Sequence, residues 1–254
     1  MSTTQSAAIG IIGGADGPTA IFVASNSLVP QLLSVAAALA IGYLLGSLMF
    51  GIIVSKGLFH DDVRSHGSGN AGSTNILRTY GKGAAILALA GDMGKGVLAV
   101  FLARWAACLI FGLPLDCAGA AFGPEGFNVG AAAAFAALLG HMKPLYFGFK
   151  GGKGVAVAAG TILAAAPRVF VALLVVFVVV VIISRIVSLT SITCAVCYPI
   201  FTAVDCVLAG SSHTVFNTVC ALVMAAIVVW LHRTNIQRIR DGKEYRFFGK
   251  KKNK

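Results

Sequence analysis

Long apolar runs separated by short polar segments occupy most of the chain between residues 31 and 231. An α-helix needs about 20 predominantly apolar residues to cross a hydrocarbon core of about 30 Å, and most of these runs approach that length. Backbone groups in lipid must be satisfied within the segment, so such runs favour helices over a barrel. We therefore predict an all-α integral membrane protein with about seven transmembrane helices, at residues 31–54, 84–111, 122–147, 154–167, 168–187, 188–209 and 213–231.

The run at residues 154–167 is short for a span, and a re-entrant segment there would reverse the sidedness of everything after it. If all seven runs cross, the most polar segments share one membrane face; these are residues 56–82, 141–153, 188–191 and 232 onward. A re-entrant run would instead divide the basic loops between the two faces. Because positively charged loops gather on one side of a membrane, the charge pattern favours the crossing arrangement.

The C-terminal end carries the strongest local charge. Between Arg233 and Lys254 there are nine Lys or Arg residues and two acidic ones, a net charge of +7, against +11 for the whole chain. Short basic segments beside a span stay in the cytoplasm, where anionic lipid attracts them. We therefore expect a cytoplasmic tail and cytoplasmic glycine-rich loops, with membrane lipid as a partner and no nucleic acid. The chain then divides into an N-terminal extension (1–30), one membrane domain (31–240) and a basic tail (241–254).

Cysteine and acidic residues do not have the spacing of a metal site or a disulfide framework. The six cysteines lie in or beside apolar runs, where small buried side chains are the expected role. The acidic residues are scattered. Asp92 and Lys95 fall within an apolar run, where a charge is costly unless it is paired, so we expect a structural ion pair. We predict no metal ion and no cofactor.

Residues 67–78 form a small, polar, glycine-rich loop after the first span, Gly-Ser-Gly-Asn-Ala-Gly-Ser-Thr-Asn-Ile-Leu-Arg. Glycines let backbone N–H groups converge on an anion, hydroxyls and amides add neutral donors, and Arg78 supplies a fork for phosphate oxygens. The loop lacks the Gly-Lys-Ser/Thr ending of a nucleotide P-loop and follows no strand, which disfavours ATP. A plain connecting loop has a similar composition, so this segment alone leaves both readings open.

A second glycine-rich segment on the same face shifts the balance towards phosphate binding. It runs from Gly140 to Gly154 and ends where a helix is expected to begin, which adds free N–H groups and a favourable dipole for an anion. Two such segments facing each other predict two phosphorylated substrates. The residues that we expect to bind phosphate are Gly67, Gly69, Asn70, Gly72, Thr74, Asn75, His141, Lys150, Gly151, Gly152 and Gly154.

With these motifs the chain resembles the bacterial acyl-phosphate-dependent glycerol-3-phosphate acyltransferases, a family described as having seven spans. The motifs occur in order over most of the chain. They are the 67–78 loop, Asp92 with Lys95-Gly96, Gly140-His-x-x-Pro144, Phe149-Lys-Gly-Gly-Lys-Gly-Val-Ala156, Ser188-Leu-x-Ser191-Ile, and His232-x-x-Asn235-Ile-x-Arg238.

The resemblance implies a reaction, its substrates and a set of site residues. A fatty acyl group would pass from an acyl phosphate to the sn-1 hydroxyl of glycerol 3-phosphate in the bacterial plasma membrane. The products would be lysophosphatidic acid and phosphate, in the first acylation of phospholipid synthesis, and a soluble enzyme that makes acyl phosphate would be a partner. The residues implied to be catalytic are Ser68, Arg78, Lys153, Ser191, His232 and Asn235.

Some of these residues have plainer alternatives. Ser191 could bond a helix carbonyl, and His232 could anchor the last span at the membrane interface. The acceptor of the hydroxyl proton also stays open, between His232 and a phosphate oxygen of the substrate, which the family is thought to use. No histidine is followed five residues later by aspartate, which argues against the acyltransferases that use acyl-CoA or acyl-carrier protein through that pair.

Residues 10–22 lie outside the family pattern and resemble a segment of the beta subunits of sodium-pumping decarboxylases. An inherited leader, or a half-inserted helix broken at Gly17-Pro18, are alternatives, and a role as a subunit of an ion-pumping complex rests on this stretch alone. An organophosphate or anion transporter is the other functional alternative. The gathering of polar motifs at one face, without a visible repeat, favours the enzyme.

Overall fold

The structure, a computed structural model, describes residues 8–12, 20–24, 28–111, 128–211 and 214–246. Its helices are α1 (Leu28–Gly46), α2 (Phe50–Phe59), α3 (Ser73–Tyr80), α4 (Lys82–Phe111), α5 (Val129–Met142), α6 (Val155–Ala165), α7 (Pro167–Ser184), α8 (Val187–Leu208), α9 (Thr214–Leu231) and α10 (Arg233–Arg240). Short 3₁₀ turns lie at Val63–Ser65 and Leu145–Phe147. Two strands, β1 (Ala8–Ile12) and β2 (Ala20–Ala24), precede α1. The chain is nearly all-helical, as predicted.

Among the described residues, five helical segments are long and apolar enough to cross a membrane: Leu32–Phe59, Lys82–Ile110, Pro167–Ser184, Val187–Leu208 and Thr214–Leu231. The integral membrane character is therefore confirmed, but the predicted count of seven is not. Helices α5 and α6 have 14 and 11 residues. At 1.5 Å per residue they are about 21 and 16 Å long, less than a full bilayer core. Part of the predicted span at 122–147 lies outside the described residues.

The first predicted span, residues 31–54, is not one continuous helix, because α1 ends at Gly46 and α2 begins at Phe50. Two side chains of α4 satisfy backbone groups at this break. Lys95 donates to the carbonyl of Leu48, and Asp92 accepts from the N–H of Phe50 at 3.4 Å. An interruption at membrane depth is tolerated when buried protein groups replace the missing helical bonds. Hydropathy alone does not show such a break.

Small residues let the central helices pack backbone against backbone. A Cβ placed on Gly46 of α1 would lie 2.2 Å from the carbonyl oxygen of Ala137 in α5. A Cβ on Gly160 of α6 would lie 2.0 Å from the carbonyl oxygen of Met93 in α4. Membrane helices associate largely through such close contacts, since lipid supplies little hydrophobic drive between them. The glycines thus fix α5 and α6 against the two long helices beside them.

Two features end helix α6 early: a side chain that bonds its last carbonyl groups, and a proline that follows it. The guanidinium of Arg104 in α4 donates to the carbonyl oxygens of Ala164 at 3.0 Å and Ala165 at 3.4 Å. Pro167 begins α7 after one intervening residue, Ala166, and proline disfavours helical backbone in the residue before it. The chain therefore turns back immediately at Ala166.

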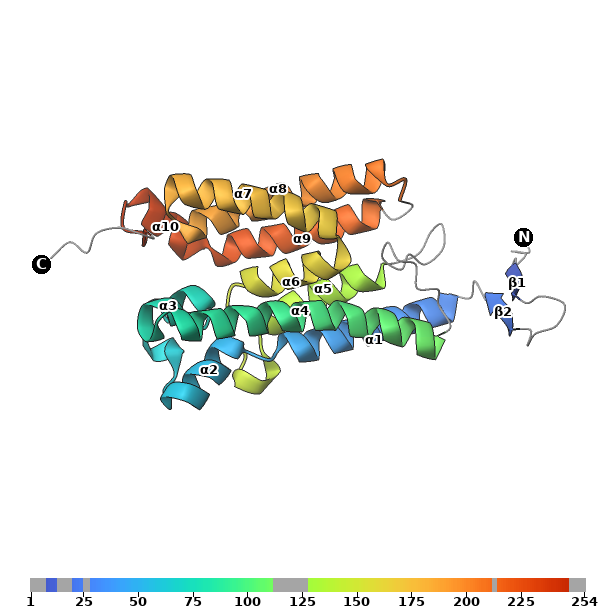
Figure 1. The fold of residues 1–254 in the computed structure, drawn as a ribbon, viewed down its shortest axis with the longest axis horizontal. Helices are drawn as coiled ribbons and strands as arrows, with labels where there is room; N and C mark the ends of the chain where they lie inside the picture. Colours follow the sequence, from blue (N-terminus) through green and yellow to red (C-terminus); the bar gives the residue numbers. More distant parts are fainter. Residues whose placement is uncertain (1–7, 13–19, 25–27, 112–127, 212–213, 247–254) are drawn as a thin grey trace, which may run out of the picture.

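The helices alternate in direction, so that the predicted polar segments meet at one end of the bundle (Figure 1). The loop from α2 to α3, the loop from α5 to α6, the turn between α7 and α8, and α10 all lie at this end. The opposite end carries the turn between α6 and α7, the end of α8 and the N-terminal strands (Figure 1). This arrangement agrees with the predicted single face for the polar segments.

The described part of the N-terminal extension is a hairpin. β1 and β2 pair antiparallel, with Ala8 opposite Ala24 and Ile12 opposite Ala20. A half-inserted helix is therefore wrong for these residues, and the Gly17-Pro18 pair proposed to break it lies outside the described residues. The hairpin lies beyond the end of the bundle that is opposite to α10 (Figure 1).

Candidate active site

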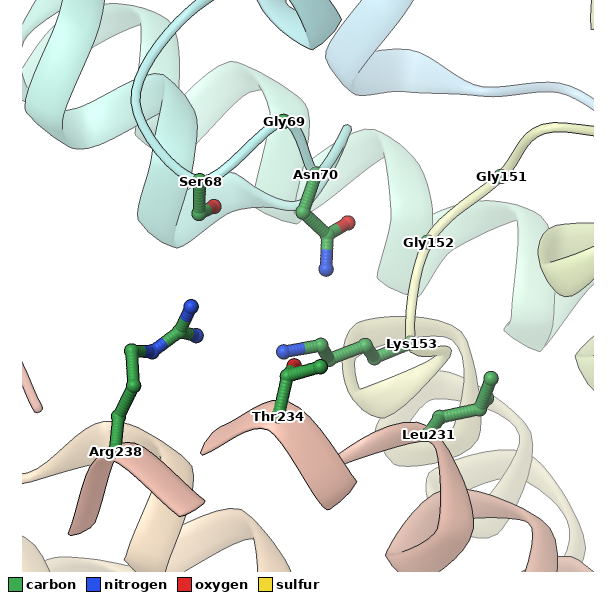
Figure 2. Close-up of a pocket in the computed structure, with 9 residues that line it drawn as sticks. All are labelled: Ser68, Gly69, Asn70, Gly151, Gly152, Lys153, Leu231, Thr234 and Arg238. Atoms are coloured by element: carbon green, nitrogen blue, oxygen red, sulfur yellow. The ribbon is translucent and has the colours of Figure 1, made fainter. Parts of the chain in front are cut away.

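A pocket of about 220 Å³ lies where the polar segments meet. This is smaller than the roughly 300–1,000 Å³ of sites for drug-sized ligands, and its size and polar lining suit a small charged molecule. Figure 2 shows the loop after α2 on one side, the loop before α6 on another, and α10 facing both. The lining residues are Ser68, Gly69, Asn70, Gly151, Gly152, Lys153, Leu231, Thr234 and Arg238.

Asn75 shapes the first loop from inside. Its amide nitrogen donates to the carbonyls of Val63 at 3.1 Å and His66 at 2.9 Å. Its amide oxygen accepts from the backbone N–H of Ser68 at 3.0 Å. Gly67 has a φ of +57°, which a residue with a side chain rarely adopts, and a Cβ there would meet the Asn75 side chain. The loop therefore wraps around one buried amide and presents residues 68–70 to the pocket.

Arg64 ties the first loop to the second. Its guanidinium pairs with Asp62 at 2.7 Å and donates to the carbonyls of Phe147 at 3.1 Å and Lys150 at 3.3 Å. Hydrogen bonds from Arg64 lower the pKa of Asp62 to about 2, so the pair stays charged at neutral pH. Two loops more than 80 residues apart are thus held at a fixed separation on one side of the pocket.

The second loop packs against the end of α5 at its two glycines. The N–H of Gly152 donates to the carbonyl of His141 at 3.0 Å. A Cβ on Gly152 would lie 2.4 Å from Nε2 of His141, and one on Gly151 would lie 2.0 Å from the His141 carbonyl oxygen. Only glycine fits at these two positions, which places the backbone beside the pocket and directs the Lys153 side chain into it (Figure 2).

The imidazole of His141 faces a buried ion pair, which confirms the expected pairing of Asp92 with Lys95. The Lys95 ammonium lies 2.7 Å from a carboxylate oxygen of Asp92 and 2.9 Å from Nδ1 of His141. All three residues are less than 5 % exposed. The same ammonium closes the break after α1, so this cluster connects the α1–α2 break to the glycine loop of the pocket.

Glu244 organises the side of the pocket formed by α10. Its carboxylate accepts from Arg238 Nε at 2.7 Å, from the Asn235 amide at 2.8 Å and from the Ser188 hydroxyl at 2.9 Å. Burial alone would raise the pKa of Glu244, but these hydrogen bonds lower it below its usual value. The carboxylate is therefore ionised at neutral pH, and it holds the Arg238 side chain through a hydrogen bond made outside the pocket lining.

Positive charge dominates the pocket itself. Lys153 extends toward the open centre, and Arg238 points into it from α10 (Figure 2). Burial lowers the pKa of Lys153, and the positive charges of Arg238 and Arg78 lower it further, to about 8. The positive charges of the two arginines destabilise the protonated form of Lys153, and a bound anion would reduce this repulsion. The amide oxygen of Asn235 accepts from Lys153 on one side.

Six of the predicted site residues line this pocket together: Ser68, Gly69, Asn70, Gly151, Gly152 and Lys153. Asn235 contacts Lys153 without lining the pocket. The remaining predicted residues lie outside the lining: Gly67, Gly72, Thr74, Asn75, Arg78, His141, Lys150, Gly154, Ser191 and His232. Of these, Asn75 and His141 are buried in the contacts described above, and Lys150 is exposed on the surface.

Ser191 makes the helix-carbonyl contact that its plainer alternative predicted, whereas His232 is buried, at 3 % exposed, and does not lie as an interfacial anchor would. The Ser191 hydroxyl donates to the carbonyl of Val187 at 2.9 Å. Nδ1 of His232 lies 2.7 Å from the carbonyl oxygen of Val228. Because a carbonyl only accepts, Nδ1 carries the proton, and a neutral ring then keeps its lone pair on Nε2. Burial lowers the pKa of His232, which favours this neutral form.

Three lining residues did not emerge from sequence reasoning: Leu231, Thr234 and Arg238. A usable signal was present, because spacings of three and four place these side chains on one face of a helix. Arg238 belongs to a motif already recognised, but its side chain had no role assigned. Glu244 was likewise noted only for its charge, and its three hydrogen bonds depend on how the chain turns after α10.

Comparison with known proteins gives two matches at the family level. Residues 36–242 match the profile described as glycerol-3-phosphate acyltransferase. Residues 1–63 match the profile described as the beta subunit of Na⁺-transporting oxaloacetate decarboxylase. The second match covers the stretch at 10–22 and extends well beyond it, so that the two profiles overlap from residue 36 to residue 63.

Individual relatives cover most of the chain. A glycerol-3-phosphate acyltransferase of Neisseria meningitidis serogroup C is 39% identical over 212 residues, 84% of this chain and 96% of the relative. One of Paraburkholderia phytofirmans is 42% identical over 213 residues, 84% of this chain and 90% of the relative. The crystal structure of PlsY, an integral membrane glycerol 3-phosphate acyltransferase, in its glycerol 3-phosphate form has a TM-score of 0.69 and 34% identity, covering 84% of this chain and 96% of that one. Its lysophosphatidic acid form gives 0.66 and 33%, covering 84% and 95%.

Proposed function

We propose that this chain, which belongs to the glycerol-3-phosphate acyltransferase family, catalyses the transfer of a fatty acyl group from acyl phosphate to glycerol 3-phosphate in this pocket. The observation that carries the proposal is that two cationic side chains, Lys153 and Arg238, line one small polar pocket opposite the Ser68–Asn70 loop. Both substrates bear phosphate, and both cations are placed to bind it. The product is lysophosphatidic acid, the first acylated intermediate of phospholipid synthesis.

The chemistry requires alignment and charge stabilisation rather than a strong nucleophile. An acyl phosphate is a mixed anhydride, so the sn-1 hydroxyl oxygen attacks its carbonyl carbon, and the bond from that carbon to the phosphate oxygen breaks. Lys153 and Arg238 stabilise negative charge on the phosphates, while the Ser68 hydroxyl and the glycine N–H groups add neutral donors. The hydroxyl proton leaves to the departing phosphate or to His232. The products are the ester and inorganic phosphate.

The predicted residues outside the lining receive supporting roles in this proposal. Asn235 holds Lys153 in place and is itself bonded to Glu244. His232 precedes α10 and influences the same charges, since Lys153 and Glu244 both shift its pKa. Ser191 lies one helical turn from Ser188, whose hydroxyl donates a hydrogen bond to Glu244. The charge of Arg78 lowers the pKa of Lys153, and Arg78 is proposed to bind a substrate phosphate at the edge of the pocket.

Replacing His232 with alanine is expected to lower substrate affinity and rate without abolishing acyl transfer, because a substrate phosphate oxygen can accept the hydroxyl proton. The variant should retain a measurable single-turnover rate with palmitoyl phosphate. His232→Gln, which can keep a donor towards Val228, is the matched control for packing. Complete loss of turnover with unchanged glycerol 3-phosphate affinity would instead identify His232 as an essential base.

Glycerol 3-phosphate affinity is expected to fall about tenfold between pH 7 and pH 9. Lys153 is mostly protonated below its pKa of about 8 and mostly neutral above it, whereas the second phosphate pKa of about 6 leaves the ligand a dianion throughout. Isothermal titration calorimetry on the purified protein measures this directly. Lys153→Arg should flatten the profile, because arginine stays charged, and a pH-independent wild-type affinity would contradict the assignment.

We place the pocket and the C-terminus at the cytoplasmic face of a bacterial plasma membrane. The positive-inside bias supports this orientation, since the pocket end carries exposed Lys143, Lys150 and Arg233 together with the basic tail. Arg168, near the opposite end, is paired with Asp205 at 2.9 Å. A soluble enzyme that makes acyl phosphate could then deliver its product to the same face.

The N-terminal extension is proposed to take no part in acylation, because its described hairpin lies at the end of the bundle away from the pocket (Figure 1). Its similarity to a segment of a sodium-transporting decarboxylase subunit ends within the first part of the membrane domain. The proposed domains stay 1–30, 31–240 and 241–254, although α1 begins at Leu28, three residues before the first of these boundaries.

The function is tested with purified protein in vesicles, palmitoyl phosphate and labelled glycerol 3-phosphate, with palmitoyl-CoA as a parallel donor. Labelled lysophosphatidic acid from palmitoyl phosphate alone is expected, both for the full chain and after removal of residues 1–25. Absence of product with either donor would refute the proposal, and activity with the CoA donor alone would refute the mechanism. Uptake of label into sealed vesicles without product would favour the transporter.

A further inference from the structure

The guanidinium of Arg78 lies over the ring of Tyr245. Its guanidinium carbon is 4.1 Å from the ring centroid, within the range of a cation–π contact. The two residues come from distant parts of the chain, since Arg78 belongs to α3 and Tyr245 follows α10. Tyr245 also lies beyond residue 242, where the match to the family profile ends. The contact bridges the two sides of the pocket end.

We propose that Tyr245 is a positioning residue for the acylation reaction, holding Arg78 in the orientation in which it binds a substrate phosphate. The inference rests on the proposed function. It assigns a role to a side chain that belongs to none of the recognised motifs and that lies within the basic tail, residues 241–254.

The contact with Tyr245 leaves the hydrogen-bond donors of Arg78 available. The N–H groups of a guanidinium point outward along its in-plane edge, and a cation–π contact does not pair them with a hydrogen-bond acceptor. Among the described residues, this guanidinium forms no hydrogen bond and no ion pair. Phosphate is bound through that in-plane edge, often by two parallel N–H bonds. The contact therefore restrains Arg78 without occupying its donors.

The neighbouring residue, Glu244, anchors the backbone from which the Tyr245 side chain extends. Glu244 is bonded to side chains of α8 and α10, and its side chain is only 5 % exposed. Tyr245 follows directly, so its backbone starts from an anchored point although the ring is 46 % exposed. An arginine on the surface of an eight-residue helix would otherwise lose considerable side-chain entropy on binding. Prior ordering on Tyr245 reduces this loss.

Removing the contact should weaken glycerol 3-phosphate binding by a modest, measurable factor. Cation–π contacts at exposed sites correspond to roughly a twofold to fivefold change in affinity. Calorimetric titration of Tyr245→Leu with glycerol 3-phosphate, or KM for either substrate, should show a loss of this size with kcat changed less. Tyr245→Phe, which keeps the ring, should stay within twofold of wild type. Tyr146→Leu, which changes a similarly exposed tyrosine at 51 %, is the matched control and should behave as wild type.

A double-mutant cycle separates positioning from general damage. In an Arg78→Ala background, Tyr245→Leu should have no further effect on either KM, because its action passes through Arg78. Additive losses, or equal losses for Tyr245→Leu and Tyr245→Phe, would overturn the inference. Thermal unfolding should give the same midpoint for all Tyr245 variants. Wild-type protein that makes no lysophosphatidic acid would count against the proposed function, whereas active wild type with an unaffected Tyr245→Leu would count against this inference alone.

Discussion

Replacing Lys153 with alanine is expected to reduce kcat/KM for acyl transfer by roughly 10²–10³-fold, the range seen when one preorganised donor to a developing negative charge is removed. Lys153 extends into the pocket from a backbone fixed by two glycines that pack on α5. Burial, and then the positive charges of Arg238 and Arg78, lower its pKa to about 8, so a bound phosphate would stabilise its charged form. Steady-state kinetics with palmitoyl phosphate and glycerol 3-phosphate measure the effect.

Lys150 provides the matched comparison, since it has the same charge, lies three residues away and is exposed outside the pocket. Lys150→Ala should change kcat/KM by less than about threefold, the scale of a solvent-screened surface charge. Lys153→Arg should retain more activity than Lys153→Ala because it keeps the charge. Equal losses at positions 150 and 153 would contradict the assignment of the pocket charge to Lys153.

Hydropathy predicted most of the helices because lipid-facing segments must be continuously apolar and self-bonded. The ends of α4, α7, α8 and α9 lie within a few residues of the predicted spans. The break after Gly46 could not be predicted in this way, since the segment stays apolar while the Lys95 and Asp92 side chains of another helix satisfy its backbone. Nor does composition show that Arg104 ends α6 early.

The site was predicted in outline but not residue by residue. The two glycine-rich loops indicated an anion site, the family resemblance implied Ser68 and Lys153, and the structure brings both residues to one pocket. Asn75, however, lies in α3, and its side chain turns towards the preceding loop to bond the carbonyls of Val63 and His66, as buried backbone groups require. An amide that binds phosphate and an amide that supports a loop look the same in sequence. Only the fold distinguishes them.

Charge balance links the site to the rest of the molecule. The pocket contains two cations in its lining, Lys153 and Arg238, and one carboxylate, Glu244, lies behind them. Glu244 partly offsets their repulsion without entering the pocket, which leaves the front open for an anion. The buried pair of Lys95 and Asp92 is different in kind, because it is closed to solvent and supports the backbone around the pocket.

Replacing Lys95 with methionine is expected to be the most destabilising single change in the bundle. It leaves Asp92, which is 1 % exposed, without its ammonium partner, and the second carboxylate oxygen of Asp92 already has no hydrogen-bond partner in the described part of the chain. Breaking a buried ion pair from one side typically costs about 3–5 kcal/mol. For a chain of this size that corresponds to a fall in Tm of roughly 6–20 °C, measured by thermal unfolding in detergent.

The double variant Asp92→Asn/Lys95→Met is the decisive comparison, because it removes both charges while an amide oxygen can still accept from Phe50. It should recover most of the lost Tm, since the main penalty in the single variant is an uncompensated buried charge. Activity should recover less than stability, because His141 has lost the partner that holds it against the Gly152 loop. If the single and double variants unfold at the same temperature, the buried charge is not what makes Lys95 important, and its bond to Leu48 at the α1–α2 break must account for the loss.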